Sequence, residues 1–575
     1  MKILSFLLIL AISTAYASFD GGLKLTDENY SLERQFCLKN DSIYIEVYDP
    51  DLDTNGSVRE TLNVQVSSPV ETAGDTVKLI ETWSGTEWVL RGAIKLDSSA
   101  TPINNDGKIQ ATMGQLIIVK YQESMNQYDN PVLHERRALF VGTVIDGGTA
   151  GNVTWLKTFS PYFVNSSYQV NVGDTLTIQP GTKIYFPSNG DIHSEGVKLT
   201  VYGNLQAEGT SSDSIIFASF GIQPTADDWE GLYVYNGSIH LKYGVIRNSE
   251  YGVRWEYGYD PSPRNNLVRH SSFIRNKTAI RQYVYNAPNS SFVIDSNDIE
   301  LFATLDSSSF AGISVNQSTS VEDTLIITDN KIRIHNTASS NSNYGMELYG
   351  RYSGGTYYRA VIDRNIVMAD SAYTGKNTVG IYYSNFKDSD LRNNRVSGFN
   401  RGLQLCQNSG SVITGNIFTR NSRDCYIDCT PDIQIRNNAF ASNAVGGYGL
   451  YNVNWADIDA RNNYWGATAT TEMNGGGNPK NISRIFDKMD DSYSGKVDYA
   501  GWLSDTAGTP SATGNEGFVE LLENGQYTFR QHFITGENAL VRVIDADLNT
   551  NNSTAQTVKI RFQTGVESTD TLVLT

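Results

Sequence analysis

The order of apolar and polar residues between positions 390 and 466 repeats four times. Each repeat places an apolar residue, then asparagine, then a second apolar stretch near a glycine. The shared asparagines are separated by 22, 22 and 25 residues and are Asn394, Asn416, Asn438 and Asn463. This interval is too long for a heptad and too short for a paired-helix repeat, so it predicts coils of a β-solenoid.

Stacking of coils explains this interval. In a parallel β-helix the strands of one coil lie about 4.8 Å from those of the previous coil. Asparagine at a turn then hydrogen-bonds to the asparagines above and below, and it tolerates left-handed backbone angles. Gly402 and Gly449 mark another tight corner, at which Asp424 takes the place of glycine. An antiparallel sandwich is the alternative, but it provides no reason for asparagine to return at this spacing.

Apolar residues and cysteines of these coils have predicted directions. The apolar positions expected to face inward are Val412, Ile417, Ile427, Ile435, Phe440 and Leu450. Cys425 matches Leu403 in register and should also face inward, whereas Cys406 and Cys429 lie near one corner of adjacent coils. A disulfide between these two is one interpretation, and a metal site is the weaker one because CYIDC lacks zinc-site spacing and histidine partners. Cys37 lies in an apolar strand and is expected to be a buried thiol.

Alternation of apolar and polar residues marks the segments outside the repeats. Residues 42–68 alternate on both sides of an Asp/Asn-rich turn, which is typical of antiparallel strands. Residues 545–551 repeat residues 49–55 at a constant offset of 496. We therefore expect an immunoglobulin-like β-sandwich and a second, partial copy of it. Because the second copy stops where the first continues, we expect the chain to be part of a longer modular protein.

The first residues are typical of a secretory signal peptide. Lys2 precedes an apolar run and Ala15-Tyr16-Ala17, a small-residue cleavage site. The run is too short to span a membrane. The predicted organisation is a signal peptide at 1–17, a β-sandwich at 18–141, a parallel β-helix at 142–505, a flexible polar linker at 506–516 and a partial second sandwich at 517–575.

Short motifs at the two ends of the solenoid carry a family resemblance. They are Gly173-Asp174-Thr175-Leu176, Pro180-Gly181-Thr182 and Trp229-Glu230-Gly231 near its start, and Asn463-Tyr464-Trp465-Gly466 near its end. With them the segment resembles bacterial right-handed parallel β-helix repeat proteins, the carbohydrate-binding and sugar-cleaving solenoids. The resemblance implies an all-β fold, a right-handed parallel β-helix between immunoglobulin-like surface-protein repeats. It is specific for fold and poor for function.

Charge and composition limit the classes of molecule that the chain is expected to bind. The formal net charge of -17 would repel nucleic acid at long range. With 33 tyrosines, 50 glycines and 14 prolines, the chain favours strands and turns. The expected partners are extracellular polysaccharide or cell-surface glycans and further domains of a longer chain, without membrane insertion.

An acidic turn is the candidate metal site. Asp49, Asp51, Asp53, Asn55 and Glu60 stand at relative positions 1, 3, 5, 7 and 12, as oxygen ligands do in a calcium loop. The sixth position lacks the glycine of an EF-hand, and no helices flank the turn. A looser calcium site and a solvated turn held by side-chain hydrogen bonds are the two interpretations.

Aromatic residues are concentrated at 251–263, 349–361 and 380–386. Exposed aromatic rings stack on sugar rings, and arginine binds hydroxyl or carboxylate groups. The candidate glycan-binding residues are Trp255, Tyr257, Tyr259, Arg351, Tyr352, Tyr357, Tyr358 and Tyr383. The alternative is that these residues are good strand formers that stack coil on coil.

No catalytic residue is assigned. Asp227-Asp228 and Asp490-Asp491 are adjacent carboxylates, but neighbours on a strand point to opposite faces. We therefore expect a secreted or cell-surface structural or adhesive protein whose β-helix binds glycans. The alternatives are a polysaccharide lyase or glycoside hydrolase, and a spacer. Carboxylates clustered with each other or with arginine on an exposed strand face would favour the enzyme, and ladders of aromatic residues would favour binding.

Overall fold

The computed structural model describes residues 20–574 except for the segments 54–56, 83–87, 125, 127, 129, 189–195, 221–223, 260–263, 287–289, 303–309, 318–323, 336–342, 351–358, 371–377, 430–432, 443–445, 515–516, 523–537, 539, 546–547, 549–554 and 563–569. The predicted signal peptide lies outside the described residues. The described chain is almost entirely β-structure, with one short α-helix, α1 (Ala467–Asn474).

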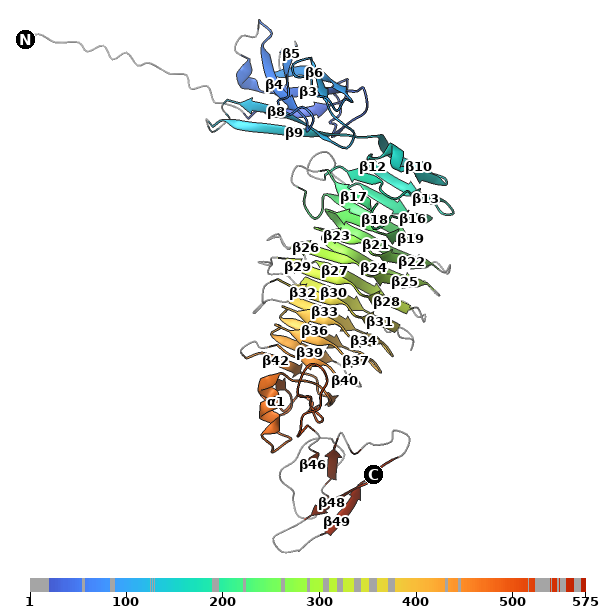
Figure 1. Cartoon of the computed structure of the whole chain (residues 1–575), viewed down its shortest axis with the longest axis vertical. Coiled ribbons are helices and arrows are strands. Elements are labelled where there is room, and N and C mark those ends of the chain that lie inside the picture. The colour runs from blue at the N-terminus through green and yellow to red at the C-terminus, as the bar shows by residue number, and fades with distance from the viewer. Residues whose placement is uncertain are drawn as a thin grey trace, which may run out of the picture.

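The N-terminal part forms one mostly antiparallel sheet in the order β1-β3-β6-β5-β4-β8-β9-β2, with β7 beside β6 (Figure 1). The strands are β1 (Gly22–Thr26), β2 (Phe36–Cys37), β3 (Ser42–Tyr48), β4 (Thr61–Ser67), β5 (Asp75–Glu81), β6 (Val89–Asp97), β7 (Lys108–Gln110), β8 (Leu116–Glu123) and β9 (Val132–Phe140). Alternation in the sequence becomes alternation in burial, since Ile43, Ile45 and Val47 of β3 enter one shared apolar core. The immunoglobulin-like assignment of this unit stays a prediction.

From residue 143 onward the chain winds into coils whose strands build three parallel stacks (Figure 1). Stack 1 contains β11 (Val153–Trp155), β13 (Thr175–Ile178), β16 (Asn204–Glu208), β19 (Ser238–Lys242), β22 (Asn265–Arg269), β25 (Ser291–Asp295), β28 (Thr324–Thr328), β31 (Arg359–Asp363), β34 (Asp390–Arg392), β37 (Val412–Thr414), β40 (Gln434–Arg436), β43 (Ile458–Asp459) and β45 (Val497–Asp498).

Stack 2 contains β14 (Lys183–Phe186), β17 (Ile215–Ser219), β20 (Gly244–Arg247), β23 (Ser272–Ile274), β26 (Asp298–Phe302), β29 (Lys331–His335), β32 (Ile366–Ala369), β35 (Arg395–Ser397), β38 (Ile417–Thr419) and β41 (Ala439–Phe440). Stack 3 contains β15 (Lys198–Val201), β18 (Trp229–Tyr235), β21 (Ser249–Tyr259), β24 (Thr278–Asn286), β27 (Ala311–Gln317), β30 (Asn343–Tyr349), β33 (Thr378–Ser384), β36 (Arg401–Cys406), β39 (Arg423–Cys429), β42 (Tyr448–Asn452) and β44 (Ile485–Phe486). The opening strands β10 (Thr143–Ala150) and β12 (Tyr162–Val170) precede them. This arrangement confirms the predicted right-handed parallel β-helix.

A ladder of asparagines links the coils, as predicted. Its members are Asn297, Asn330, Asn365, Asn394, Asn416, Asn438 and Asn463. For example, the backbone N and the Nδ2 of Asn394 donate to Oδ1 of Asn416 at 2.9 and 3.0 Å. The left-handed residue, however, is the one before each ladder asparagine, such as Asn437 with a φ of 57°. The ladder asparagine itself satisfies buried backbone groups.

Four of the predicted core residues are fully buried: Ile427, Ile435, Phe440 and Leu450. Two predictions are wrong. Val412 is 42% exposed, and Ile417 lies on the outer face of β38. Their neighbours Ile413 and Phe418 fill the core instead. Because side chains alternate along a strand, an error of one residue in phase exchanges the two faces.

Both ends of the β-helix are covered. At the N-terminal end, Phe36, Leu139 and Val141 pack against Phe163 of β12, and the Phe36 and Phe163 ring centres are 5.2 Å apart. At the other end, Trp465 and Trp502 are fully buried beside α1. Covering the ends keeps the apolar column of a solenoid away from water.

The segment predicted as a flexible linker is bonded to the last coil over its described part. Oδ1 of Asn474 accepts from Trp502 Nε1 at 2.7 Å, from Ser511 Oγ at 2.7 Å and from Thr513 Oγ1 at 2.8 Å. Ser511 is buried. Flexibility of this segment stays a prediction from its composition, beside these hydrogen bonds to the end of α1.

The C-terminal strands reproduce the pairing of the N-terminal unit. They are β46 (Phe518–Leu522), β47 (Leu540–Ile544), β48 (Val558–Phe562) and β49 (Asp570–Leu574). Phe518 pairs with Ile544 as Gly22 pairs with Tyr48, which is the offset of 496 on both strands. The repeated sequence therefore also repeats a strand register.

Candidate functional site

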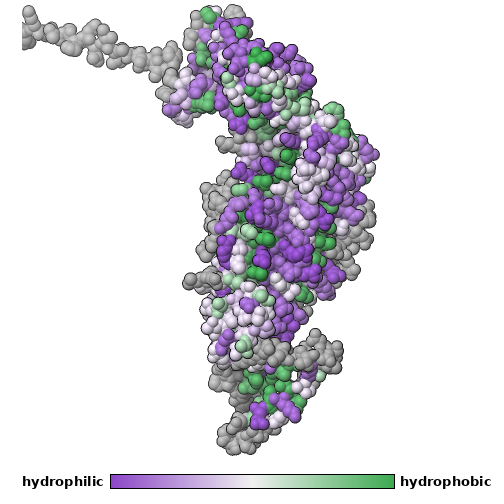
Figure 2. Space-filling view, viewed as in Figure 1, coloured by the Kyte–Doolittle hydropathy of each residue, from purple (hydrophilic) through white to green (hydrophobic). Residues whose placement is uncertain are grey.

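The outer surface of stack 3 carries one row of side chains along the β-helix axis. Strand register places each member opposite the next on the neighbouring coil. The row consists of Tyr233, Arg254, Arg281, Ser314, Glu347, Tyr382, Gln404, Tyr426, Tyr451 and Phe486. Hydrophobic residues interrupt the otherwise hydrophilic surface of the coils at several places (Figure 2). Because coils are about 4.8 Å apart, the row presents its groups at short, regular intervals.

The C-terminal part of this row is a stack of rings covered by guanidinium groups. We call Arg401, Arg423, Tyr426, Tyr451 and Phe486 the Arg–Tyr stack. The ring centres of Tyr426 and Tyr451 are 5.7 Å apart at 14°, and those of Tyr451 and Phe486 are 4.2 Å apart at 11°. Arg401 lies 4.3 Å from the Tyr426 ring centre, and Arg423 lies 4.6 Å from that of Tyr451. All five side chains are partly exposed.

A second cluster of the same kind lies on β18, β21 and β24. The guanidinium carbon of Arg254 is 5.0 Å from the ring centres of both Tyr233 and Tyr251. Arg281 donates to the Tyr251 hydroxyl at 2.8 Å. Burial raises the pKa of Tyr233, although Arg254 lowers it. This phenol therefore stays protonated at neutral pH and is a poor base.

The two clusters differ in their charge partners. Arg254 pairs with the Glu256 carboxylate at 2.8 Å. In the described part of the chain, neither Arg401 nor Arg423 pairs with a carboxylate, and Arg401 donates to Oε1 of Gln404 at 2.9 Å. The Arg–Tyr stack thus keeps donor capacity that a ligand can use.

The coils that form this surface match known families. Residues 236–481 match a family model described as periplasmic copper-binding protein (NosD), and residues 147–261 match a pectate-lyase like beta helix domain. The chain is a parallel β-helix protein. A periplasmic family agrees with an exported protein, and no helix of the described residues is long and apolar enough to cross a bilayer. The sequence matches no curated protein.

Three predicted glycan-binding residues are wrong because they lie inside the β-helix. Trp255, Tyr257 and Tyr383 are 0%, 2% and 0% exposed and belong to the apolar core. On β21 the outward neighbours of Trp255 are Arg254 and Glu256. The aromatic segment was identified correctly. Because adjacent strand residues face opposite sides, however, the prediction of which residues face outward was wrong.

The side chains of the other predicted glycan-binding positions lie outside the described part of the chain. The side chain of Tyr259, at the end of β21, lies outside the described residues, as do the residues Arg351, Tyr352, Tyr357 and Tyr358.

Sequence reasoning missed Tyr382, Gln404 and Tyr426, of which Gln404 is buried although it belongs to the row. Tyr382 is the outward neighbour of Tyr383. Because Ile381 is apolar and faces inward, alternation along the strand could have predicted that Tyr382 faces outward. Gln404 and Tyr426 are 22 residues apart, the same interval as Asn394 and Asn416.

The predicted calcium residues separate into two groups. Asp49 is buried, accepts from the backbone N of Asp51 at 3.0 Å and accepts the Tyr121 hydroxyl. Burial raises the pKa of Asp49. Asp49 therefore has the side-chain hydrogen bonds of the second interpretation, but it is buried rather than solvated, and Asn55 lies outside the described residues.

The other group gains a member that sequence reasoning missed. Carboxylate oxygens of Asp53, Glu60 and Glu81 lie within 4.8 Å of one another. Burial raises the pKa of Glu81, and the charges of Glu60 and Asp53 raise it further. Carboxylate oxygens are the ligands that calcium prefers, so these three residues could hold a cation. Calcium binding stays a prediction.

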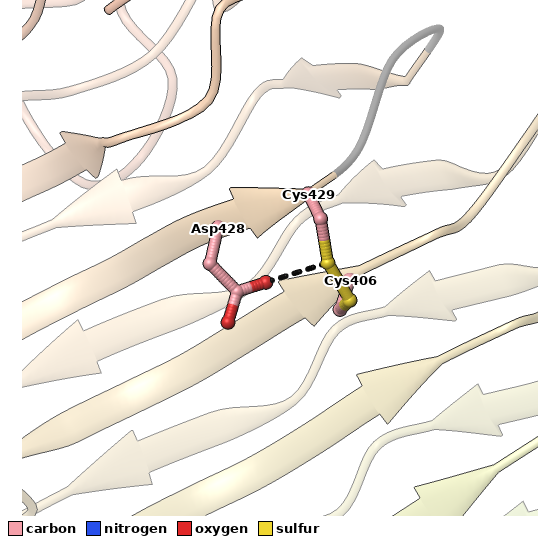
Figure 3. A group of neighbouring side chains, drawn as sticks. All are labelled: Cys406, Asp428 and Cys429. Carbon is pink, nitrogen blue, oxygen red and sulfur yellow. Dashed lines mark hydrogen bonds between the residues drawn. A yellow bond between two sulfur atoms is a disulfide. The ribbon is translucent and has the colours of Figure 1, made fainter.

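Cysteines follow their predicted directions. Cys406 and Cys429 form a disulfide between adjacent coils, and Asp428 lies beside it (Figure 3). Cys37 and Cys425 are buried free thiols. Burial raises the pKa of both thiols, so neither is reactive.

Carboxylates lie with arginine on strand faces of stack 1, where Arg392 contacts Asp363 and Asp390, and of stack 2. Arg333 contacts Asp298 at 2.9 Å and also pairs with Glu300. Nδ1 of His335, two residues further along β29, is paired with Asp370. By contrast, Asp228 of the adjacent acidic pair is a buried acceptor for Ser219 and Thr225.

Proposed function

We propose that the chain is an exported structural or adhesive protein whose β-helix binds polysaccharide along the outer row of stack 3. The observation that carries this proposal is the Arg–Tyr stack, in which rings and guanidinium groups of successive coils are in register on a partly exposed surface. Here aromatic faces meet two arginines, Arg401 and Arg423, that have no carboxylate partner in the described part of the chain.

Such a surface suits a sugar polymer. Aromatic rings offer apolar faces to sugar rings, and arginine forks donate to hydroxyl or carboxylate oxygens. The side chains stand on hydrogen-bonded strands, which hold them more firmly than loops would. Binding therefore needs little reordering of the protein.

A polysaccharide lyase or glycoside hydrolase is the second candidate, and Asp298, Glu300 and Arg333 favour it. Both carboxylates are already paired with the single charge of Arg333, however, which leaves fewer of their oxygens for acid–base chemistry.

Copper, which one matched family is named for, does not fit the residues described. Copper prefers thiolate, thioether or imidazole ligands. Cys406 and Cys429 are joined as a disulfide, and Cys37 and Cys425 are buried. No group of three potential metal ligands in the described part of the chain contains a histidine.

The test is a glycan-array experiment with the full chain, in which the same samples are assayed for reducing or unsaturated sugar ends. Retention without product, lost in Tyr426→Ala and Tyr451→Ala, supports the binding function. Product that disappears in Glu300→Gln would replace it with the enzyme. Absence of both signals would contradict both candidates and leave a spacer.

A further inference from the structure

Backbone hydrogen bonds between adjacent coils hold the two cysteines of the Cys406–Cys429 disulfide next to each other. Cys406 ends β36, Cys429 ends β39, and strand register places them opposite each other with their Cα atoms 4.7 Å apart. Their carbonyls accept backbone hydrogen bonds, Asn385 N to Cys406 O at 3.1 Å and Gln407 N to Cys429 O at 2.8 Å. Coil stacking, independently of the S–S bond, therefore keeps the two residues adjacent.

A carboxylate is oriented toward the sulfur atoms (Figure 3). Oδ1 of Asp428 lies 3.0 Å from Sγ of Cys429. The other oxygen, Oδ2, accepts from Nε2 of Gln404 at 3.1 Å, and Oε1 of Gln404 accepts from Arg401 at 2.9 Å. These hydrogen bonds hold the Asp428 carboxylate in one orientation. In metal sites, hydrogen bonds to the ligands orient the ligands in the same way.

We propose that Cys406, Cys429 and Asp428 form a binding site for one thiophilic d¹⁰ ion, Zn(II), when the disulfide is reduced. A small dithiol supplies two electrons and two protons. The S–S bond breaks, two thiols form, and the dithiol becomes a disulfide. Metal binding then displaces the thiol protons to solvent.

The ligand set fits this class of ion. One potential ligand atom from each of the three residues lies within 4.8 Å of the others. Thiolates bind Zn(II) at about 2.3 Å, and a carboxylate oxygen binds it at about 2.0 to 2.2 Å. Three protein ligands leave one coordination position open. All three residues are partly exposed, so an ion can enter.

The test compares oxidised protein with protein reduced by a phosphine and desalted without oxygen. Each form is titrated with Zn(II) against a chromophoric chelator, and thiolate-to-metal charge-transfer absorption is recorded. We expect one ion per reduced chain and none per oxidised chain. Asp428→Asn should weaken binding about tenfold, and Cys406→Ser with Cys429→Ser should abolish it.

Two controls keep the proposal falsifiable. Asp390→Asn, a partly exposed acid on stack 1, should leave the affinity unchanged. The thermal unfolding midpoint of the reduced protein shows whether coil stacking holds the site without the S–S bond. Equal binding by the double serine variant, or unfolding on reduction, would overturn the proposal.

Discussion

The guanidinium carbon of Arg401 lies 4.3 Å from the ring centre of Tyr426, a residue of the next coil. The contact joins two coils and leaves guanidinium N–H groups for a ligand. Tyr426→Ala should reduce glycan affinity about tenfold, or about 1.4 kcal/mol, because it removes a stacking face and releases Arg401. Titration of immobilised glycan measures this loss. Tyr493→Ala is the matched control, since Tyr493 is 86% exposed in the closing segment; an equal loss there would refute a localised site.

Trp255→Ala tests the corrected assignment. Trp255 is fully buried, and its ring packs edge-on against Phe292 at 5.6 Å. We expect a loss of about 3 to 5 kcal/mol in unfolding free energy, measured by denaturant titration. Glycan affinity of the remaining folded protein should be unchanged. A selective loss of affinity without destabilisation would restore Trp255 as a binding residue.

Asn416→Ala should interrupt the asparagine ladder. Oδ1 of Asn416 accepts from Asn394, and its Nδ2 donates to Leu391 O at 2.9 Å and to Asn438 at 2.9 Å. Leaving these buried partners unsatisfied should cost about 3 kcal/mol in unfolding free energy. Asn437→Gly serves as control, because this exposed residue has a φ of 57° and glycine adopts it readily. Equal destabilisation by both changes would argue against the ladder.

The buried carboxyl group of Asp424 should make the stability of the folded chain decrease as the pH rises. Burial raises the pKa of Asp424 to about 7, although Ser442 and Arg484 lower it. The folded chain then holds this proton at pH values where the unfolded chain has lost it, so Asp424 should make stability fall as pH rises from about 4 to about 7. Thermal midpoints across this range measure the effect. Asp424→Asn should flatten this part of the profile, and an unchanged slope would exclude Asp424 as its source.

Repeats in the sequence predicted the coil architecture well. The spacing of Asn394, Asn416 and Asn438 predicted both the solenoid and its ladder, because each stacked coil brings the equivalent residue to the same place. The same register placed Cys406 and Cys429 near one corner of adjacent coils, where a disulfide was one interpretation and the structure has one. The sequence predicted less well which face each residue of a short strand occupies. In the three-residue strand β38, the apolar Ile417 lies on the outer face and Phe418 lies inside.

Sequence by itself determined the all-β coils, the ladder and the concentration of aromatic residues, because these follow from periodicity along one chain. Only the tertiary structure decided that Tyr382 rather than Tyr383 lies on the outer face, and that Tyr426, Tyr451 and Phe486 form one stack with Arg401 and Arg423. It also added Glu81 to Asp53 and Glu60. Such groupings join residues of different strands, and their distances depend on register and strand phase, which a single sequence constrains only weakly.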